Sequence, residues 1–94
     1  MPQIQFLVHD SADTVGVATM DLMAGETASG LYMDTQDAIE IVPLDNIPLG
    51  HKIALKDHQV GEGVIKYEHD IGKVVADIKL AQHVHVHNLR TRRW

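Results

Sequence analysis

Three histidines alternate with two valines near the end of this chain, in the segment HVHVHN of residues 83–88. Side chains of a β-strand point alternately to its two faces, so a strand here would carry the three imidazoles on one face and both valines on the other. An imidazole can act near neutral pH as a metal ligand, a general acid or a general base. The row therefore indicates a metal or acid–base site or, as the alternative, a polar strand face whose histidines serve only as hydrogen-bonding groups.

The spacing of the histidines limits which of them can share one ion. His85 and His87 would lie about 6.5–7 Å apart along a strand, which lets both reach an ion at about 2.0–2.1 Å from each ring nitrogen. His83 would lie about 13 Å from His87 on a straight strand, too far for all three to converge. We therefore take His85 and His87 as candidate metal ligands and expect a third ligand from another strand or another chain, with His51 and His9 as candidates.

A second candidate group is the tripeptide Gly50-His51-Lys52. Glycine lets a backbone approach a ligand closely, and the His and Lys that follow could hold an anion. The alternative is an ordinary turn followed by a strand. A polar cluster at Asp10 and Asp13, between two expected strands, is similarly open to an ion site or to simple turn formation.

A basic tail, residues 90–94, ends the chain with three arginines and Trp94. A guanidinium binds carboxylate, phosphate or sulfonate through two parallel hydrogen bonds, so Arg90 is a candidate anion-binding residue. The tail could instead be solvated and frayed, as chain ends commonly are.

Composition excludes several classes of protein. The formal net charge of −5 argues against general nucleic-acid binding. The chain has no cysteine, which excludes disulfides and thiolate metal sites supplied by its own residues. With no signal-like segment and no apolar run long enough to cross a membrane, we expect a cytoplasmic protein without a membrane partner. At 94 residues the chain is expected to form one domain.

The apolar pattern predicts an all-β fold. No run of ten residues carries the apolar stripe of an amphipathic helix, and Gly, Asp and Pro separate short β-rich runs at intervals typical of all-β domains. The expected strands are residues 3–8, 15–20, 39–44, 51–56, 63–68, 72–78 and 83–89. Alternation within three of them predicts inward side chains at Ile4, Phe6, Val8, Ile53, Leu55, Val84 and Val86.

A degenerate pattern recurs along the chain: an acid, then apolar residues, then a small residue four positions on. It occurs at residues 21–25, 57–61 and 77–81, and with one insertion at 45–50. Each Asp is expected to bond its own turn, and each glycine can take a positive φ without steric cost. Such frequent tight turns favour a folded-over, clip-like sheet.

Taken in order, six segments resemble one known family: residues 6–10, 13–18, 47–55, 64–67, 71–72 and 83–88. The family comprises the SAF domains of altronate and galactarate dehydratases and the related small subunits of sulfolactate sulfo-lyases. The similarity covers essentially the whole chain, including its basic, Trp-terminated end. It implies a single SAF-type β-clip domain over residues 1–94 that works with a separate large lyase subunit.

The resemblance also implies a reaction. Members of the family eliminate a leaving group from the β-carbon of a small anionic 2-hydroxy acid, with a divalent metal, usually iron, implicated and held mainly by the large subunit. For a carbon–sulfur lyase the leaving group is sulfite, and 3-sulfolactate gives pyruvate. For an altronate-type dehydratase, which is the alternative, the leaving group is water. A stand-alone, non-enzymatic binding or assembly module is a further alternative, and an isolated small subunit is expected to self-associate through the surface meant for its partner.

The family motifs carry over onto the GHK turn and the HxHN strand of this sequence. His83 is expected to be a bystander, since the strand-distance argument places it farthest from the GHK group. The resulting site residues are His87, Asn88 and His51 as catalytic groups, Gly50, Lys52 and Arg90 as substrate-binding groups, and His85 and His87 as metal ligands.

Overall fold

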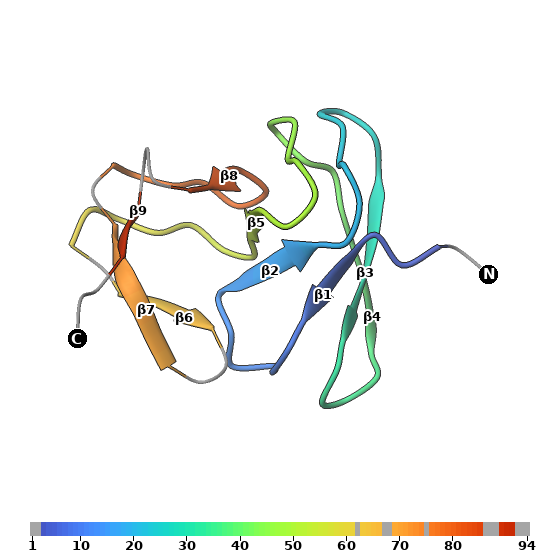
Figure 1. Cartoon of the computed structure of the whole chain (residues 1–94), viewed down its shortest axis with the longest axis horizontal. Helices are drawn as coiled ribbons and strands as arrows, with labels where there is room; N and C mark the ends of the chain where they lie inside the picture. Colours follow the sequence, from blue (N-terminus) through green and yellow to red (C-terminus); the bar gives the residue numbers. More distant parts are fainter. Residues whose placement is uncertain (1–2, 62, 67–68, 75, 86–88, 92–94) are drawn as a thin grey trace.

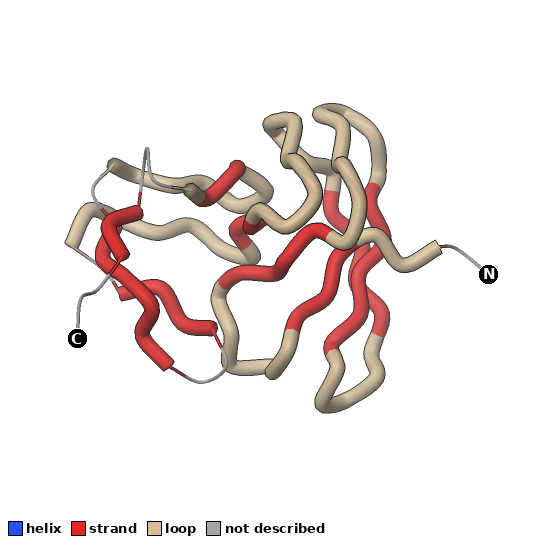
Figure 2. The backbone as a smooth tube through the Cα atoms, in the orientation of Figure 1, coloured by secondary structure: helices blue, strands red, loops and turns tan. Residues whose placement is uncertain are grey.

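The structure, a computed structural model, describes residues 3–61, 63–66, 69–74, 76–85 and 89–91. These residues form strands, turns and loops without a helix, which confirms the all-β prediction (Figure 2). In that part of the chain there is accordingly no helix long and apolar enough to cross a membrane. The strands are β1 (Phe6–Val8), β2 (Val15–Ala18), β3 (Ala28–Tyr32), β4 (Ala38–Ile41), β5 (Lys52–Ala54), β6 (Gly63–Lys66), β7 (His69–Val74), β8 (His83–Val84) and β9 (Leu89–Thr91).

The strands form two sheets. The larger sheet has the order β4-β3-β1-β2-β5-β8, and the smaller has the order β6-β7-β9. The β1–β3 pair is parallel, and every other strand pair is antiparallel. Figure 1 shows β1 to β4 at one end of the molecule and the small sheet at the other, with β5 and β8 between them. The large sheet meets the small one at β2, which contacts β6.

The core is aliphatic around a single phenylalanine. Phe6 is fully buried, and its ring lies directly over β3, where a Cβ on Gly30 would come within 2.2 Å of it. Only glycine fits at this position while the ring stays in place. Phe6, Val8, Ile53 and Val84 point inward as expected, whereas Ile4 is 36% exposed at the start of the described chain.

The recurring acid-to-small-residue turns pair with one another in space. Turns 21–25 and 46–50 form one pair, which we name the first clip, and turns 57–61 and 77–81 form the second clip. In the first clip Leu22 and Ile47 exchange two backbone hydrogen bonds of 2.8 Å each. In the second clip His58 and Ile78 do the same at 2.7 and 2.8 Å. All four of these residues are at most 1% exposed, so each clip contributes two side chains to the core.

Each clip is closed by reciprocal bonds from side chain to backbone. In the first clip Asp21 Oδ1 accepts the Leu49 N–H at 2.9 Å, and Asn46 Oδ1 accepts the Ala24 N–H at 2.9 Å. The second clip repeats this: Asp57 Oδ1 accepts from Leu80 at 2.7 Å and Asp77 Oδ1 from Val60 at 2.9 Å. The residue that ends each turn has a positive φ, and these residues are Gly25, Gly50, Gly61 and Ala81.

The turn prediction was therefore right about the glycines and wrong about the bonding partner. Each acceptor side chain bonds the N–H of the opposite turn rather than its own, because the two turns lie antiparallel. In the turn with an insertion, Asn46 takes the place that Asp21 takes in its partner, and Asp45 is the extra residue. The pairing of distant turns is what folds the sheet over.

Two strand predictions need correction. β3 was not expected, because its sequence ASGLY is poor in strand-forming residues; its contacts with β1 and β4 and the Phe6–Gly30 packing override that preference. The expected strand over residues 83–89 is interrupted: β8 ends at Val84, and β9 begins at Leu89. Arg90, expected in a basic tail, pairs in β9 with Lys73 of β7. Val86 lies outside the described residues.

We predict that Asp21→Ala lowers the free energy of unfolding by about 1 kcal/mol, because the Leu49 N–H loses its charged acceptor. Asp57→Ala is expected to act similarly in the second clip. Urea unfolding of the full chain measures both changes. Asp37→Ala, at an exposed carboxylate in the β3–β4 turn, is the control and should change stability by less than about 0.5 kcal/mol. Equal losses in all three variants would contradict a specific role for the clip bonds.

Candidate functional site

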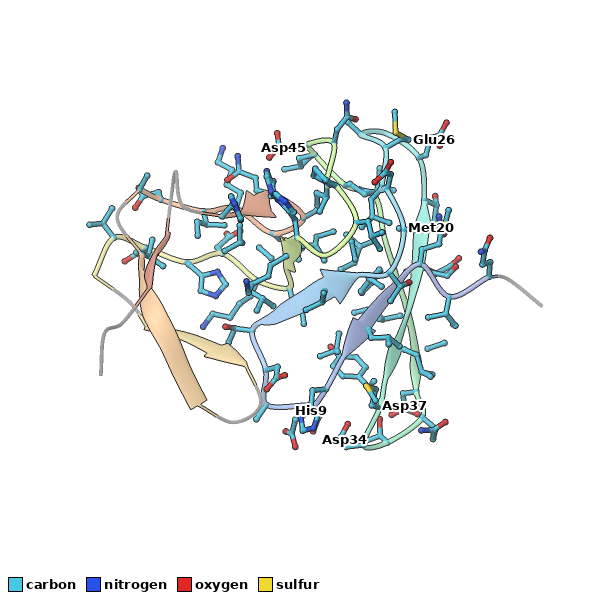
Figure 3. The ribbon with its side chains drawn as sticks, viewed as in Figure 1. His9, Met20, Glu26, Asp34, Asp37 and Asp45 are labelled. Atoms are coloured by element: carbon cyan, nitrogen blue, oxygen red, sulfur yellow. The ribbon has the colours of Figure 1, made fainter. Side chains whose placement is uncertain are left out.

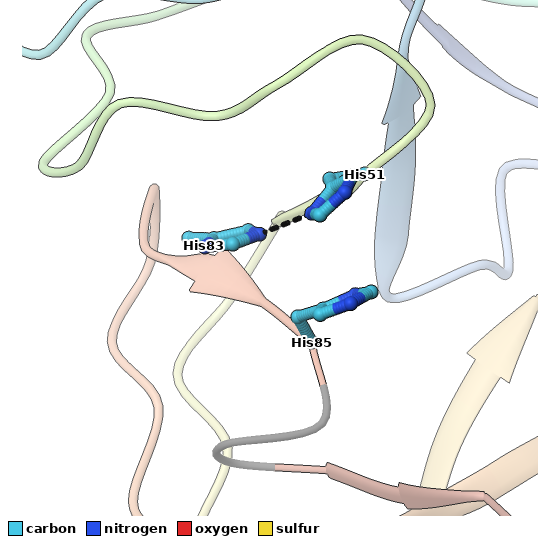
Figure 4. Close-up of side chains that lie close together, drawn as sticks. All are labelled: His51, His83 and His85. Carbon is cyan, nitrogen blue, oxygen red and sulfur yellow. Dashed lines mark hydrogen bonds between the residues drawn. The ribbon is translucent and has the colours of Figure 1, made fainter.

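Three histidine rings gather where β5 meets β8. His51 Nδ1 lies 2.8 Å from His83 Nε2, and the two form a hydrogen bond (Figure 4). The ring centroids of His51 and His85 are 4.1 Å apart, and those of His83 and His85 are 5.6 Å apart. One ligand nitrogen from each ring lies within 4.8 Å of the other two. All three rings are half-buried, so the cluster is open to small solutes.

Strand pairing brings these histidines together. β5 and β8 are antiparallel, with Lys52 opposite Val84 and Ile53 opposite His83. His51, just before β5, is therefore near the residues that follow Val84. Val84 points into the core, so the alternation of the segment directs its two histidine neighbours away from it. The predicted alternation thus holds for His83 and His85, although β8 itself ends at Val84.

Backbone bonds fix two of the three positions. The Gly50 N–H donates to Ala18 O, and the Ala18 N–H donates to His51 O, both at 2.9 Å. The His83 N–H donates to Asp45 Oδ2 at 3.0 Å. Asp45 is the inserted residue of the first clip, and its carboxylate now has a role that the sequence did not indicate: it anchors the strand that carries His83.

A hollow of about 320 Å³ lies on another part of the large sheet. Leu7, Val15 and Val17 supply apolar wall, and the polar side chains of His9, Asp13, Thr19 and Lys52 line it with Met33 and the Gly50 backbone. Asp10 and Asp13 form one turn, since Asp10 Oδ1 accepts the Ala12 N–H at 2.8 Å and the Asp13 N–H donates to Asp10 O at 2.9 Å. Asp13 is nevertheless only 5% exposed and also lines the hollow.

The side chains of the GHK tripeptide point to two different surfaces, the histidine cluster and the hollow. Neighbouring residues of an extended chain point to opposite faces, so His51 contacts the other histidines while Lys52 lines the hollow. Gly50 has φ +85° at the end of its clip turn, with nothing within 4 Å of where a Cβ would lie. The turn geometry therefore favours a glycine here, although Ala81 takes a similar positive φ at the equivalent position of the second clip.

The structure brings only some of the sequence-predicted site residues together. The structure brings His51 and His85 together and adds His83, so the expectation that His83 lies farthest from the GHK group is wrong. That error came from treating the histidine segment as one straight strand and ignoring pairing with β5. His9, the other candidate third ligand, lines the hollow instead, at the end of the view opposite to Asp45 (Figure 3). His87 and Asn88 lie outside the described residues, and of Arg90 only the backbone is described.

The loops at the His9 end are tied together by one exposed carboxylate. Asp34 Oδ2 accepts the Ser11 N–H at 3.0 Å, and its Oδ1 accepts the Thr35 N–H at 2.9 Å. The hydrogen bond from the Ser11 backbone lowers the pKa of Asp34 from its ordinary value of 3.8. Because Met33 and His9 sit beside these two loops and line the hollow, the bond helps to hold the shape of its rim.

Comparison with known proteins identifies the family of this chain. The altronate/galactarate dehydratase SAF domain matches residues 4–92, so the chain belongs to that SAF-domain family.

Three relatives show which members of the family this chain is similar to. The chain is 46% identical to the (2R)-sulfolactate sulfo-lyase subunit alpha of Chromohalobacter salexigens over 92 residues, which cover 97% of this chain and 98% of the relative. It is 55% identical to the subunit of the same name from Paracoccus pantotrophus over 49 residues, 52% of this chain and 73% of the relative. It is 39% identical to the altronate dehydratase of Escherichia coli over 88 residues, 94% of this chain but 17% of that enzyme.

We predict that Asp34 stabilises the fold in a pH-dependent way. A carboxylate whose pKa is lowered in the folded state adds stability above its unfolded pKa, and this is lost as pH falls through the folded pKa. The melting temperature of wild type should therefore exceed that of Asp34→Asn near neutral pH, and the two should converge below pH 3.8. Asp37→Asn in the same turn is the control, and an equal gap there would show that only net charge matters.

Proposed function

We propose that this chain is the small subunit of a heteromeric carbon–sulfur lyase that eliminates sulfite from 3-sulfolactate to give pyruvate. The observation that carries the proposal is the 46% identity to a sulfolactate sulfo-lyase subunit alpha along almost the full length of both chains. A relative named as a subunit alpha implies at least one further subunit. The same relationship supports an enzyme over a stand-alone binding or assembly module.

The geometry is compatible with this chemistry. Elimination removes a proton next to a carboxylate, and imidazole is the side chain most often used for such a transfer. Sulfite leaves as a stable anion and needs a cationic group more than a proton, which Lys52 in the hollow can supply. Both the hollow and the histidine cluster are open to solvent on the isolated chain, which fits a site completed by a large subunit.

Three further features belong to the proposal. The functional protein is a hetero-oligomer with a large lyase subunit and acts in the cytoplasm. A divalent metal, with iron as the expected ion, takes part, and when bound it stabilises negative charge that develops on the substrate carboxylate and hydroxyl. His87, Asn88 and Arg90 remain candidates for the catalytic and substrate-binding groups that the family motifs suggest.

A second substrate class has its own support. The 39% identity to altronate dehydratase favours a related dehydratase subunit, in which water leaves from a sugar acid. Hydroxide must be protonated as it departs, so this reaction needs an acid at the place where sulfite needs only a cation. The difference in length, with this chain spanning 17% of that enzyme, makes the sulfo-lyase the better match.

The test combines this chain with its large partner and supplies 3-sulfolactate under anaerobic conditions with Fe²⁺. Release of sulfite and pyruvate in equal amounts is the expected result. Formation of a keto-deoxy acid from altronate, without release of sulfite from sulfolactate, would assign the chain to the dehydratases instead. No product from either substrate would reject the lyase proposal.

We predict that His51→Ala lowers kcat of the complex at least ~100-fold, the scale of losing an acid–base group or a metal ligand. His87→Ala is expected to act on the same scale. Steady-state sulfite release measures turnover, and circular dichroism with co-purification of the large subunit shows that folding and assembly survive. Near-normal turnover in an assembled His51→Ala complex would assign this histidine a structural role.

We predict that Lys52→Met raises KM for 3-sulfolactate about tenfold or more, because a hydrogen bond to a charged group contributes about 1.5–3 kcal/mol. Lys52→Arg keeps the cation and should recover most of the affinity. Lys79→Met is the matched control, since Lys79 is exposed in the second clip and away from the hollow. An unchanged KM in Lys52→Met would remove this residue from the substrate site.

A further inference from the structure

We infer that this chain by itself carries a three-histidine binding site for a divalent transition-metal ion, formed by His51, His83 and His85. The metal dependence of the lyase rests on the proposed function above, but the binding of the ion does not. The observation that carries the inference is that the three rings, from two segments more than thirty residues apart, place ligand nitrogens within 4.8 Å of one another.

The dimensions of the cluster suit a small ion. Imidazole nitrogens lie about 2.0–2.1 Å from a bound Zn²⁺, and a tetrahedral arrangement then separates them from each other by about 3.3 Å. The His51 and His83 nitrogens lie 2.8 Å apart, and one nitrogen of each ring lies within 4.8 Å of the other two. Changes of at most about 1.5 Å in these separations therefore bring all three nitrogens to bonding distance of one ion.

The type of donor selects the type of ion. Imidazole suits Zn²⁺, Fe²⁺, Co²⁺, Ni²⁺ and Cu²⁺, whereas Ca²⁺ and Mg²⁺ require oxygen ligands. Three protein ligands also leave a coordination position for water or a small anion, which is the arrangement of catalytic rather than structural sites. Asp45, whose carboxylate bonds the His83 backbone at 3.0 Å, adds negative charge beside the cluster and so favours a cation.

The backbone around the cluster is already in place. His51 is fixed through the bonds of Gly50 and of its own carbonyl to Ala18, and His83 through Asp45 and pairing with Ile53. Binding therefore costs little backbone order, and the adjustment falls on the side chains. This rigidity separates the cluster from a chance gathering of surface histidines.

The rings must turn when the ion binds. The ring planes of His83 and His85 differ by 10°, those of His51 and His85 by 22°, and those of His51 and His83 by 31°. The lone pair of a ring nitrogen lies in the ring plane, and rings inclined this little to one another do not aim three lone pairs at one point. The ion must also replace the hydrogen bond between His51 and His83. Binding is therefore expected to change the environment of all three rings together.

The site differs from what the sequence suggested. The sequence pointed to His85 and His87, with a third ligand from elsewhere, whereas the structure supplies His51 and His83 as the partners of His85. It also separates this cluster from His9, which lines the hollow together with Lys52. His9 is therefore the control for metal binding, because the sequence made it a candidate for the third ligand together with His51.

The experiment titrates Zn²⁺ into the full-length, chelator-stripped chain without a histidine tag, using calorimetry at neutral pH. One ion per chain is expected. His51→Ala and His83→Ala should each weaken binding at least ~10-fold, in the range known for losing groups that support metal sites. His9→Ala should bind as wild type does. Equal affinity in His51→Ala, His83→Ala and wild type, or loss of binding in His9→Ala, would overturn the assignment.

A second measurement needs no substitution. In NMR spectra of the wild-type chain, Zn²⁺ should shift or broaden the ring signals of His51, His83 and His85 together and leave those of His9 and His58 unchanged. No change at His51 and His83 would overturn the inference even if the variants failed to fold. If the chain binds Zn²⁺ at this site but releases no sulfite with its partner, only the proposed function is rejected. If the complex is active but its small subunit binds no ion, only this inference is rejected.

Discussion

The reciprocal bonds that close the two clips are the constraint on which the rest of the structure depends. Each clip joins turns more than ten residues apart, and in each a side-chain oxygen from one turn accepts a backbone N–H of the other. A domain with only 4% aromatic residues has few large side chains with which to fix its chain path. The hydrogen bonds that close the turns fix the chain path instead, and each turn buries one side chain beneath them.

The clips also explain where the histidines meet. His51 directly follows Gly50, the residue that ends a turn of the first clip, and His83 comes two residues after Ala81, which ends a turn of the second. The chain leaves one clip as β5 and the other as β8, and these two strands pair. The candidate metal site therefore lies where the two halves of the scaffold join, and the Asp45 insertion in the first clip reaches across to hold the second strand.

Two chemically different surfaces result from a single strand. His51, just before β5, contacts the other two histidines, whereas Lys52, the first residue of β5, lines the hollow. This gives a physical reason for the order of the GHK tripeptide: the glycine ends the turn, and the alternation after it directs the His51 and Lys52 side chains to different surfaces.

The sequence by itself determined the all-β class, the positions of the tight turns, the inward direction of Val84 and the common direction of His83 and His85, since these follow from the order of neighbouring residues. It also carried the family resemblance. Only the tertiary structure decided which turn bonds which, that β3 forms despite its weak sequence, and that His51 and His83 are partners. Those outcomes depend on register between distant segments, which is set jointly by burial and by the pairing of backbone hydrogen bonds, and no local pattern encodes such a register.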